Sequence, residues 1–230
     1  MADEPTSTLV LVPGAFHGAW LWDEVLPHLP ASTVALDLPT VTPGQAPSSG
    51  MAEDAEAIRT AIDAIEGPVT LVAHSYGGIP ATEALDETSG VAAVVYVAAF
   101  LVPVGASLLD ASGGERPAAW ADTDEPGVVA MDADGARQGL YNGVDEDVVD
   151  RYVTRMQPQA LAAFTEALSV GVPSDVPSTY VVCDEDLALP REQAEQIAAQ
   201  ARSVEHIATG HMPMLAAPEE LARLILAAAA

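Results

Sequence analysis

The segment from Val69 to Gly78 constrains the fold of this chain most, because it predicts a buried strand that reverses into a helix around one serine. An apolar run leads into Ser75, and after two glycines residues 79–85 have the pattern of a helix. Ala73 and Gly77 stand two positions before and after Ser75, where the strand and the helix approach too closely for large side chains. Such a turn exposes the serine hydroxyl at a helix N-terminus, where developing negative charge is favoured. The segment therefore predicts a nucleophilic serine.

Strand and helix patterns alternate on both sides of this turn. Apolar runs typical of buried parallel strands lie at residues 8–12, 33–38, 69–74, 91–98, 178–183 and 204–208. Helical patterns lie at residues 21–29, 51–65, 79–85 and 191–201, and a last helix begins at Pro218. This alternation predicts an α/β fold, with a mostly parallel sheet and helices on both faces. A length of 230 residues suits a single domain, residues 1–230.

Residues 100–172 break this pattern. Asp, Gly and Pro are frequent there, strand patterns stop, and helical patterns are confined to residues 145–156 and 158–169. We expect this stretch to be an inserted cap, or lid, that covers the serine.

Charge and composition narrow the class of partner. The net charge is −26, from 34 acidic residues against eight arginines and no lysine. This excludes chemistry on a lysine, makes binding to nucleic acid or an anionic membrane improbable, and favours an uncharged substrate. We interpret the acidic excess as an aid to solubility, with adaptation to high salt as the alternative.

The sequence also indicates the cellular compartment, the oligomeric state and the need for cofactors. Apolar runs stay shorter than the roughly 20 residues of a membrane span. Residues 1–5 are acidic and lack the pattern of a secretory leader. Cys183 is the single cysteine, which excludes an internal disulfide and a cysteine-rich metal site. We expect a cytoplasmic monomer or homodimer that needs no cofactor and no metal ion.

A serine hydroxyl needs a neighbouring base, which is itself oriented by a carboxylate. His211 lies between the last predicted strand and the last helix, and Asp186 follows the strand at 178–183. Parallel sheets bind ligands at the carboxyl ends of their strands, so the two residues can converge on Ser75. Asp184 and Glu185 remain alternatives for the acid.

The other four histidines are weaker candidates for the base. His28 closes an early helix and is expected at the surface, whereas His206 lies inside a strand and is expected to be structural. His74 should point away from the face that carries the serine. His17, in the glycine-rich first loop, is expected to shape that loop or to contact substrate.

Negative charge on a tetrahedral intermediate requires preorganised N–H donors. The backbone amide of Tyr76 directly follows the serine, and the amide of Ala15 lies in the first loop. Gly14 allows the backbone of that loop to approach closely. We expect these two amides to form an oxyanion hole.

Taken together, these segments resemble the α/β-hydrolase superfamily, and within it the group of methyl-salicylate esterases, hydroxynitrile lyases and their bacterial relatives. The matching stretches are residues 11–20, 35–38, 73–78, 182–186 and 210–215. The resemblance implies an α/β-hydrolase fold with a small helical cap. It also implies the order serine, acid, histidine along the chain, with Asp186 rather than Asp184 as the acid.

Departures from the family pattern bear on the reaction. Pro13 stands where many members have a histidine, and the inserted region is shorter than in the plant enzymes. The lyases use a threonine in the oxyanion loop and a lysine after the catalytic histidine. Gly14 and Met212 occupy those two places here, so the resemblance favours an esterase over a lyase.

The leading hypothesis is a serine hydrolase that cleaves a small, uncharged carboxylic ester through an acyl-serine intermediate. A first alternative is a lyase-like or cofactor-free tailoring reaction on a small aromatic or polyketide-like compound. A second is a non-catalytic binding protein on a hydrolase scaffold. Candidate pocket walls, for which ordinary core packing is the competing interpretation, are Phe16, His17, Trp120, Met131, Tyr141, Met156, Phe164 and Met212.

Overall fold

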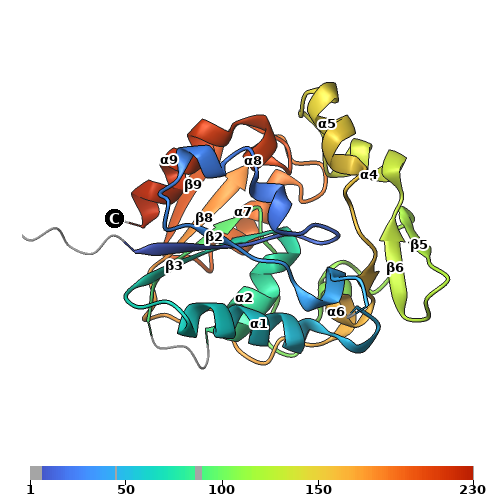
Figure 1. Ribbon diagram of the computed structural model, residues 1–230, viewed down its shortest axis with the longest axis horizontal. Helices are drawn as coiled ribbons and strands as arrows, with labels where there is room; N and C mark the ends of the chain where they lie inside the picture. Colours follow the sequence, from blue (N-terminus) through green and yellow to red (C-terminus); the bar gives the residue numbers. More distant parts are fainter. Residues whose placement is uncertain (1–6, 45, 86–89, 230) are drawn as a thin grey trace, which may run out of the picture.

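The computed structural model describes residues 7–44, 46–85 and 90–229, so the acidic residues 1–5 lie outside it. Within these residues a six-stranded sheet runs through the middle of the molecule (Figure 1). Its strands, in order across the sheet, are β2 (Val34–Ala35), β1 (Thr8–Val12), β3 (Val69–His74), β4 (Val91–Val97), β8 (Ser178–Cys183) and β9 (Ser203–Ile207). All neighbouring pairs are parallel, as the sequence predicts.

Helices cover both faces of this sheet, because side chains of the buried strands alternate between two cores. Val10 and Val12 of β1 pack into one core, and Leu9 and Leu11 pack into the other. The first core lies under α1 (Met51–Asp63), α2 (Gly78–Ala84) and α7 (Arg191–Ala198); the second lies under α8 (Pro213–Ala216) and α9 (Pro218–Ala228). In Figure 1, α1 and α2 accordingly lie on one side of the sheet and α8 and α9 on the other.

The chain after β1 is less regular than the sequence predicts. The expected helix at 21–29 is wrong: two 3-10 turns, Ala19–Trp22 and Leu26–His28, take its place. Pro27 has no N–H to donate, so an α-helix cannot continue through it. The expected strand at 33–38 shortens to β2. Two further 3-10 turns, Pro39–Val41 and Ala46–Ser48, lead to α1.

The inserted segment, residues 100–172, contains strands that the sequence analysis did not predict. An antiparallel sheet joins β5 (Trp120–Asp122), β6 (Val128–Met131) and β7 (Gln159–Ala160). Its helices are α3 (Leu108–Ala111), α4 (Ala133–Gly139), α5 (Glu146–Val153) and α6 (Ala162–Thr165). The helix expected at 158–169 shrinks to α6, because Gln159 and Ala160 pair with β6 instead. In Figure 1, β5, β6, α4 and α5 lie beside one end of the main sheet.

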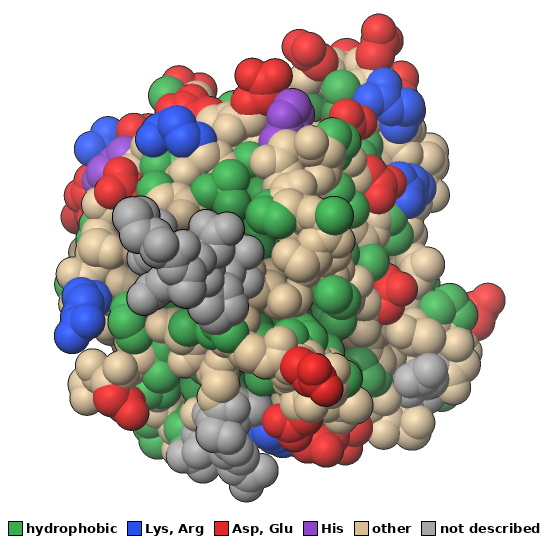
Figure 2. Space-filling view, turned by 60° about the vertical axis from the view of Figure 1, so that its left-hand side comes forward, with side chains coloured by type: hydrophobic (Ala, Val, Ile, Leu, Met, Phe, Trp, Pro, Cys, Tyr) green, Lys and Arg blue, Asp and Glu red, His purple; other side chains and the backbone are tan. Residues whose placement is uncertain are grey.

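Apart from Asp54 and Asp186, which are buried, the acidic residues of the described ranges lie at least partly on the surface of the molecule. Figure 2 shows Asp and Glu side chains distributed over the face in view, with few basic side chains among them. Ion pairs such as Arg137–Glu146 and Arg155–Asp23 link exposed side chains and leave most of the acidic excess unbalanced. None of the helices in the described ranges combines the length and apolarity needed to cross a bilayer.

Candidate active site

Ser75 occupies a sharp, strained turn between β3 and α2. Its φ of 53° lies in the left-handed region, which a non-glycine residue adopts only when its surroundings impose it. A short 3-10 turn, Ser75–Gly77, follows the strand and leads into α2. Gly77 is required here, since a Cβ at this position would lie 2.5 Å from the carbonyl oxygen of Pro13. The predicted strand-to-helix turn around the serine is therefore present.

The structure brings together the three polar residues that the sequence analysis assigned to the reaction. His211 Nε2 lies 2.9 Å from Ser75 Oγ, and His211 Nδ1 lies 2.7 Å from Asp186 Oδ2. Because a carboxylate only accepts hydrogen bonds, Nδ1 carries the proton, and Nε2 of the neutral ring accepts from the serine hydroxyl. At most 7% of any of the three residues is exposed.

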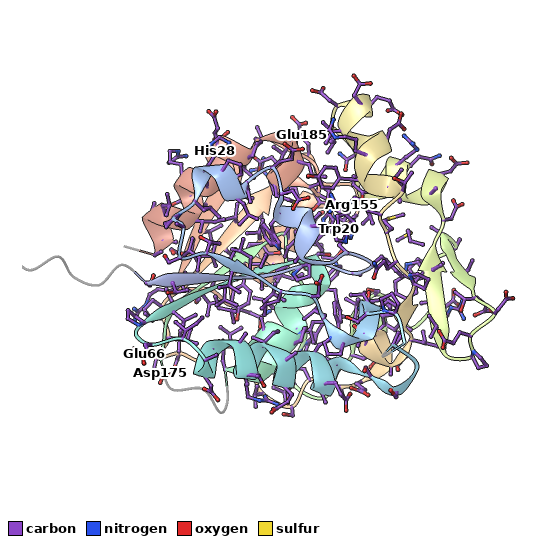
Figure 3. All side chains as sticks on the ribbon, in the orientation of Figure 1. Trp20, His28, Glu66, Arg155, Asp175 and Glu185 are labelled. Carbon is purple, nitrogen blue, oxygen red and sulfur yellow. The ribbon has the colours of Figure 1, made fainter. Side chains whose placement is uncertain are left out.

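Asp186, rather than Asp184 or Glu185, is the carboxylate beside His211. Its second oxygen, Oδ1, accepts hydrogen bonds from the amides of Ala188 and Leu189, each 2.8 Å away. These bonds fix the orientation of the carboxylate behind the ring. Asp184 points elsewhere and pairs with His206 at 2.8 Å and with Arg191 at 3.1 Å. The side chain of Glu185 is exposed (Figure 3).

The two expected oxyanion donors border one cavity beside Ser75. Ala15 and Tyr76 both line it. Within the described residues, neither backbone amide donates a hydrogen bond to another protein group. Gly14 passes so close to the nucleophile that a Cβ there would lie 3.0 Å from Ser75 Cβ. An oxyanion hole formed by these two amides stays a prediction.

His17 is buried and shapes the first loop, one of the two roles expected for it. Its Nδ1 lies 2.5 Å from the Ala15 carbonyl oxygen and therefore carries the proton. Its Nε2 then accepts a hydrogen bond from the Tyr141 hydroxyl, 2.7 Å away. Burial lowers the pKa of His17 to about 4, so the ring is neutral at pH 7.

His74 departs from the expectation that it points away from the serine's face. Its ring lies 4.8 Å from the ring of His211, and its Nε2 donates to the His211 carbonyl oxygen at 2.9 Å. Burial, reinforced by the neighbouring His211, holds the pKa of His74 well below its usual range. His74 thus supports the backbone of His211 as a neutral side chain. His28 and His206 are exposed, and neither approaches Ser75.

The cavity beside Ser75 has a volume of about 380 Å³ and no charged residue in its lining. Phe16, His17, Trp120, Met131 and Met212 line it, as the sequence analysis expected. Three expected wall residues do not: Tyr141 bonds to His17, Met156 packs in the cores, and Phe164 lies behind Phe16 and Trp120. Walls that the sequence analysis missed are Phe100, Leu108, Leu109, Pro117, Leu140 and Gln193.

Asn142, in the inserted segment, supports the loop that carries Asp186 and was also missed. Its Nδ2 donates to the Glu185 carbonyl oxygen at 2.8 Å, and its Oδ1 accepts from the Leu187 amide at 3.4 Å. A Cβ on Gly210, beside His211, would lie 2.0 Å from the Asn142 carbonyl oxygen. Asn142 thus ties the acid loop and the histidine loop to the inserted segment.

A second contact joins the inserted segment to the 3-10 turn Ala19–Trp22 and its C-cap, Asp23. The guanidinium of Arg155 lies 4.6 Å above the ring of Trp20 and pairs with Asp23 (Figure 3).

No group of three or more His, Cys, Asp or Glu residues in the described part of the chain is arranged to hold a metal ion.

Comparison with known proteins bears on the fold and the family. The profile of the alpha/beta hydrolase family matches residues 9–224. Alpha/beta hydrolase nvfD of Aspergillus novofumigatus is 30% identical over 240 residues, which cover 96% of each chain. Methylesterase 1 of Arabidopsis thaliana is 28% identical over 249 residues, which cover 94% of each. The crystal structure of a pyrethroid hydrolase from Sphingobium faniae JZ-2 matches with a TM-score of 0.82 at 22% identity, over 97% of both chains.

These findings confirm the α/β-hydrolase fold that the sequence implied. The family profile extends from β1 into α9 and so includes the whole main sheet. The nvfD relative reaches 30% identity over nearly the full length. This chain therefore belongs to the α/β-hydrolase family.

Proposed function

We propose that this chain is a carboxylic-ester hydrolase that works through an acyl-serine intermediate. The observation that carries the proposal is the hydrogen-bonded series Asp186–His211–Ser75, which opens onto a cavity without charged walls. This series supplies a nucleophile, a base and an orienting carboxylate, which acyl transfer requires.

In the first half-reaction, Ser75 Oγ attacks the ester carbonyl carbon while its proton passes to His211 Nε2. Asp186 holds the ring by Nδ1–H and stabilises the imidazolium that forms. The carbonyl oxygen becomes an oxyanion and accepts hydrogen bonds from the amides of Ala15 and Tyr76. The intermediate then collapses: the bond to the alcohol oxygen breaks, and that oxygen takes the proton from His211.

In the second half-reaction, water replaces the departed alcohol. His211 Nε2 takes a proton from the water as its oxygen attacks the acyl carbon, and a second oxyanion forms in the same hole. Collapse breaks the bond to Ser75 Oγ, which regains the proton, and releases the carboxylic acid.

The cavity favours a small, uncharged ester. Its walls are apolar and aromatic, and Phe16, Trp120 and Met212 would contact the substrate, with His17 at its polar end. The inserted segment contributes Trp120, so it would act as the cap that excludes water. The relatives named methylesterases support an ester of a small alcohol.

Two features argue against the alternatives. A hydroxynitrile lyase of this family needs a threonine and a lysine where this chain has Gly14 and Met212. A protein that only binds its ligand gains nothing from the hydrogen-bonded series at Ser75, yet that series is complete and buried.

The test compares the wild type with Ser75→Ala on short-chain p-nitrophenyl esters, together with labelling by a fluorophosphonate probe. Ser203→Ala, an exposed serine on the edge strand β9, is the matched control. The proposal expects turnover and labelling in the wild type and the control, and neither in Ser75→Ala. Labelling without ester turnover would favour the lyase or tailoring reaction. A wild type that is unlabelled and inactive but still binds small aromatic compounds would favour the binding protein.

A further inference from the structure

One buried series of hydrogen bonds links the two loops that carry the proposed oxyanion donors. These donors are backbone amides, so only the conformation of each loop sets their positions. The Ala15 and Tyr76 loops are far apart in the sequence. Because a mechanism that stabilises an oxyanion needs both amides at once, the inference rests on the proposed function.

The series begins at Phe16, next to Ala15. The Phe16 amide donates to Gln159 Oε1 at 2.8 Å, and the Phe16 carbonyl oxygen accepts from the Gln157 amide at 3.0 Å. Phe16 has a φ of 64°, which a bulky residue adopts only under constraint. The constraint comes from β7 of the inserted segment and the residues just before it, because both polar groups of the Phe16 backbone are held there.

The series continues from Gln159 through Thr40 to Asp54 in α1. Gln159 Nε2 donates to Thr40 Oγ1 at 2.9 Å, and Thr40 Oγ1 donates in turn to Asp54 Oδ2 at 2.7 Å. The Thr40 amide donates to Asp54 Oδ1 at 3.0 Å. The side chains of Thr40, Asp54 and Gln159 are fully buried, so water cannot replace these partners.

The series ends on the residue that carries the second donor. The Tyr76 hydroxyl donates to Asp54 Oδ2 at 2.7 Å, and Tyr76 is also fully buried. Asp54 therefore accepts three hydrogen bonds, and Gln159 donates one and accepts one. This arrangement fixes the loop of Ala15 relative to that of Tyr76.

We propose that Gln159 and Asp54 are positioning residues that hold the two oxyanion donors at a fixed separation. Through Gln159, a complete oxyanion hole then requires the inserted segment to be docked on the sheet. Without the Gln159 acceptor the Phe16 amide has no partner, and Phe16 can relax toward a negative φ. That rotation would turn the Ala15 amide away from the cavity. Binding of the uncharged ester depends on many wall residues besides Phe16, so it would change less than the stabilisation of the oxyanion.

The first test is Gln159→Met, which keeps the volume of the side chain and removes its polar atoms. We expect kcat for p-nitrophenyl acetate to fall about 10- to 100-fold, with KM within about threefold of the wild type, because the lost interaction belongs to the transition state. Tyr96→Phe is the matched control, since it removes an equally buried polar group that bonds to Thr82 and takes no part in the series that links the two loops. Its kcat should stay within about twofold of the wild type.

A second variant and a second measurement protect the test against simple misfolding. Tyr76→Phe removes only the hydroxyl that bonds to Asp54, and we expect kcat to fall about threefold to tenfold at similar KM. Amide hydrogen exchange at Phe16 is the measurement that needs no catalysis. We expect it to accelerate at least tenfold in Gln159→Met and to stay unchanged in Tyr96→Phe.

The outcomes separate this inference from the proposed function. If Gln159→Met keeps its kcat, or changes only KM, or loses no more kcat than Tyr96→Phe, the positioning role is wrong. If Gln159→Met does not fold, the kcat and KM of Tyr76→Phe are compared with those of Tyr96→Phe instead, and the same criteria apply. If the wild type neither hydrolyses esters nor reacts with the fluorophosphonate, the proposed function fails instead. Hydrogen exchange then decides alone: unchanged exchange at Phe16 overturns the link, and accelerated exchange supports it.

Discussion

Asp184 and Asp186 lie two residues apart in one turn, yet they face different partners. Asp186 is buried against His211, whereas Asp184 is partly exposed and pairs with His206 and Arg191. We expect Asp186→Asn to lower kcat by about 10³–10⁴-fold, because an amide at this position can hold the ring in the wrong tautomer. Asp184→Asn is the matched control and should retain kcat within about twofold. Steady-state kinetics with a p-nitrophenyl ester check both, and comparable losses in the two variants would contradict the assignment.

A second prediction concerns Asp54 and the free energy of unfolding rather than the rate of the reaction. Burial raises the pKa of Asp54 to about 6. A carboxyl group with a raised pKa in the folded protein contributes stability at low pH, and this contribution is lost as the pH rises through the folded pKa. The full loss, between the unfolded pKa of 3.8 and the folded pKa of about 6, amounts to roughly 3 kcal/mol.

The measurement is the free energy of urea unfolding at pH 5 and pH 7 for the wild type and for Asp54→Asn. The variant has no charge to desolvate, so the wild type should lose about 1 kcal/mol relative to it between these two pH values. Taking the difference removes the contribution of the many other acidic groups. A constant difference across the pH range would show that Asp54 is not desolvated as described.

Among single residues of the site, the sequence predicted those that stand in a distinctive local pattern. Ser75 stands in a strand–turn–helix signature, and His211 follows the last strand. Asp54 and Gln159 have no such signal, because an isolated polar residue in a helical or proline-flanked stretch reads as solvated. Gln159 is buried by the docking of segments more than 100 residues apart, and Asp54 by contacts with Thr40 and Tyr76, 14 and 22 residues away. No local pattern encodes either set of contacts.

At the scale of elements, Gly77 sets how closely α2 can approach β1. A Cβ there would meet the Pro13 carbonyl oxygen at 2.5 Å and Val12 Cγ1 at 3.0 Å, and backbone at the end of a buried strand cannot easily move. We expect Gly77→Ala to lower the free energy of unfolding by about 1–3 kcal/mol through overpacking. It should also lower kcat more than tenfold, because it pushes the first loop away from Ser75.

The matched control is Gly139→Ala, in α4, where a Cβ would meet no atom within 4 Å. Its helical setting predicts unchanged stability or a gain of up to about 1 kcal/mol. Urea unfolding of both variants and ester kinetics of Gly77→Ala check the prediction; Gly139 lines the cavity, so its variant is a control for stability only. If Gly77→Ala is as stable and as active as the wild type, the close approach does not constrain the turn.

Elements of the main sheet were easier to predict than those of the inserted segment. β1, β3, β4 and β8 are short apolar runs rich in β-branched residues, and this composition and length identify them as buried strands although they show no alternating pattern. β5 and β7 have only three and two residues, too few to establish a period. Their pairing depends on where the inserted segment docks, and this is why the sequence predicted helices and loops there.

At the scale of the whole molecule, the charge of −26 and the uncharged cavity act on a substrate over different distances. Salt has little effect on contacts inside the cavity. The field of the acidic surface, in contrast, extends about 30 Å at 0.01 M salt and about 8 Å at 0.15 M. An anionic ester is therefore repelled before it reaches the cavity, most strongly at low salt. A cationic ester is attracted under the same conditions.

We expect this difference to appear in kcat/KM for three p-nitrophenyl esters whose acyl groups are neutral, anionic and cationic. Between 10 and 200 mM NaCl, kcat/KM should rise several-fold for the anionic ester, fall for the cationic ester, and change less than about twofold for the neutral one. The neutral ester is the internal control, because it reports any effect of salt on the protein itself. Equal salt dependence for all three would mean that the acidic surface does not influence access to Ser75. The cavity walls alone would then determine which esters the protein selects.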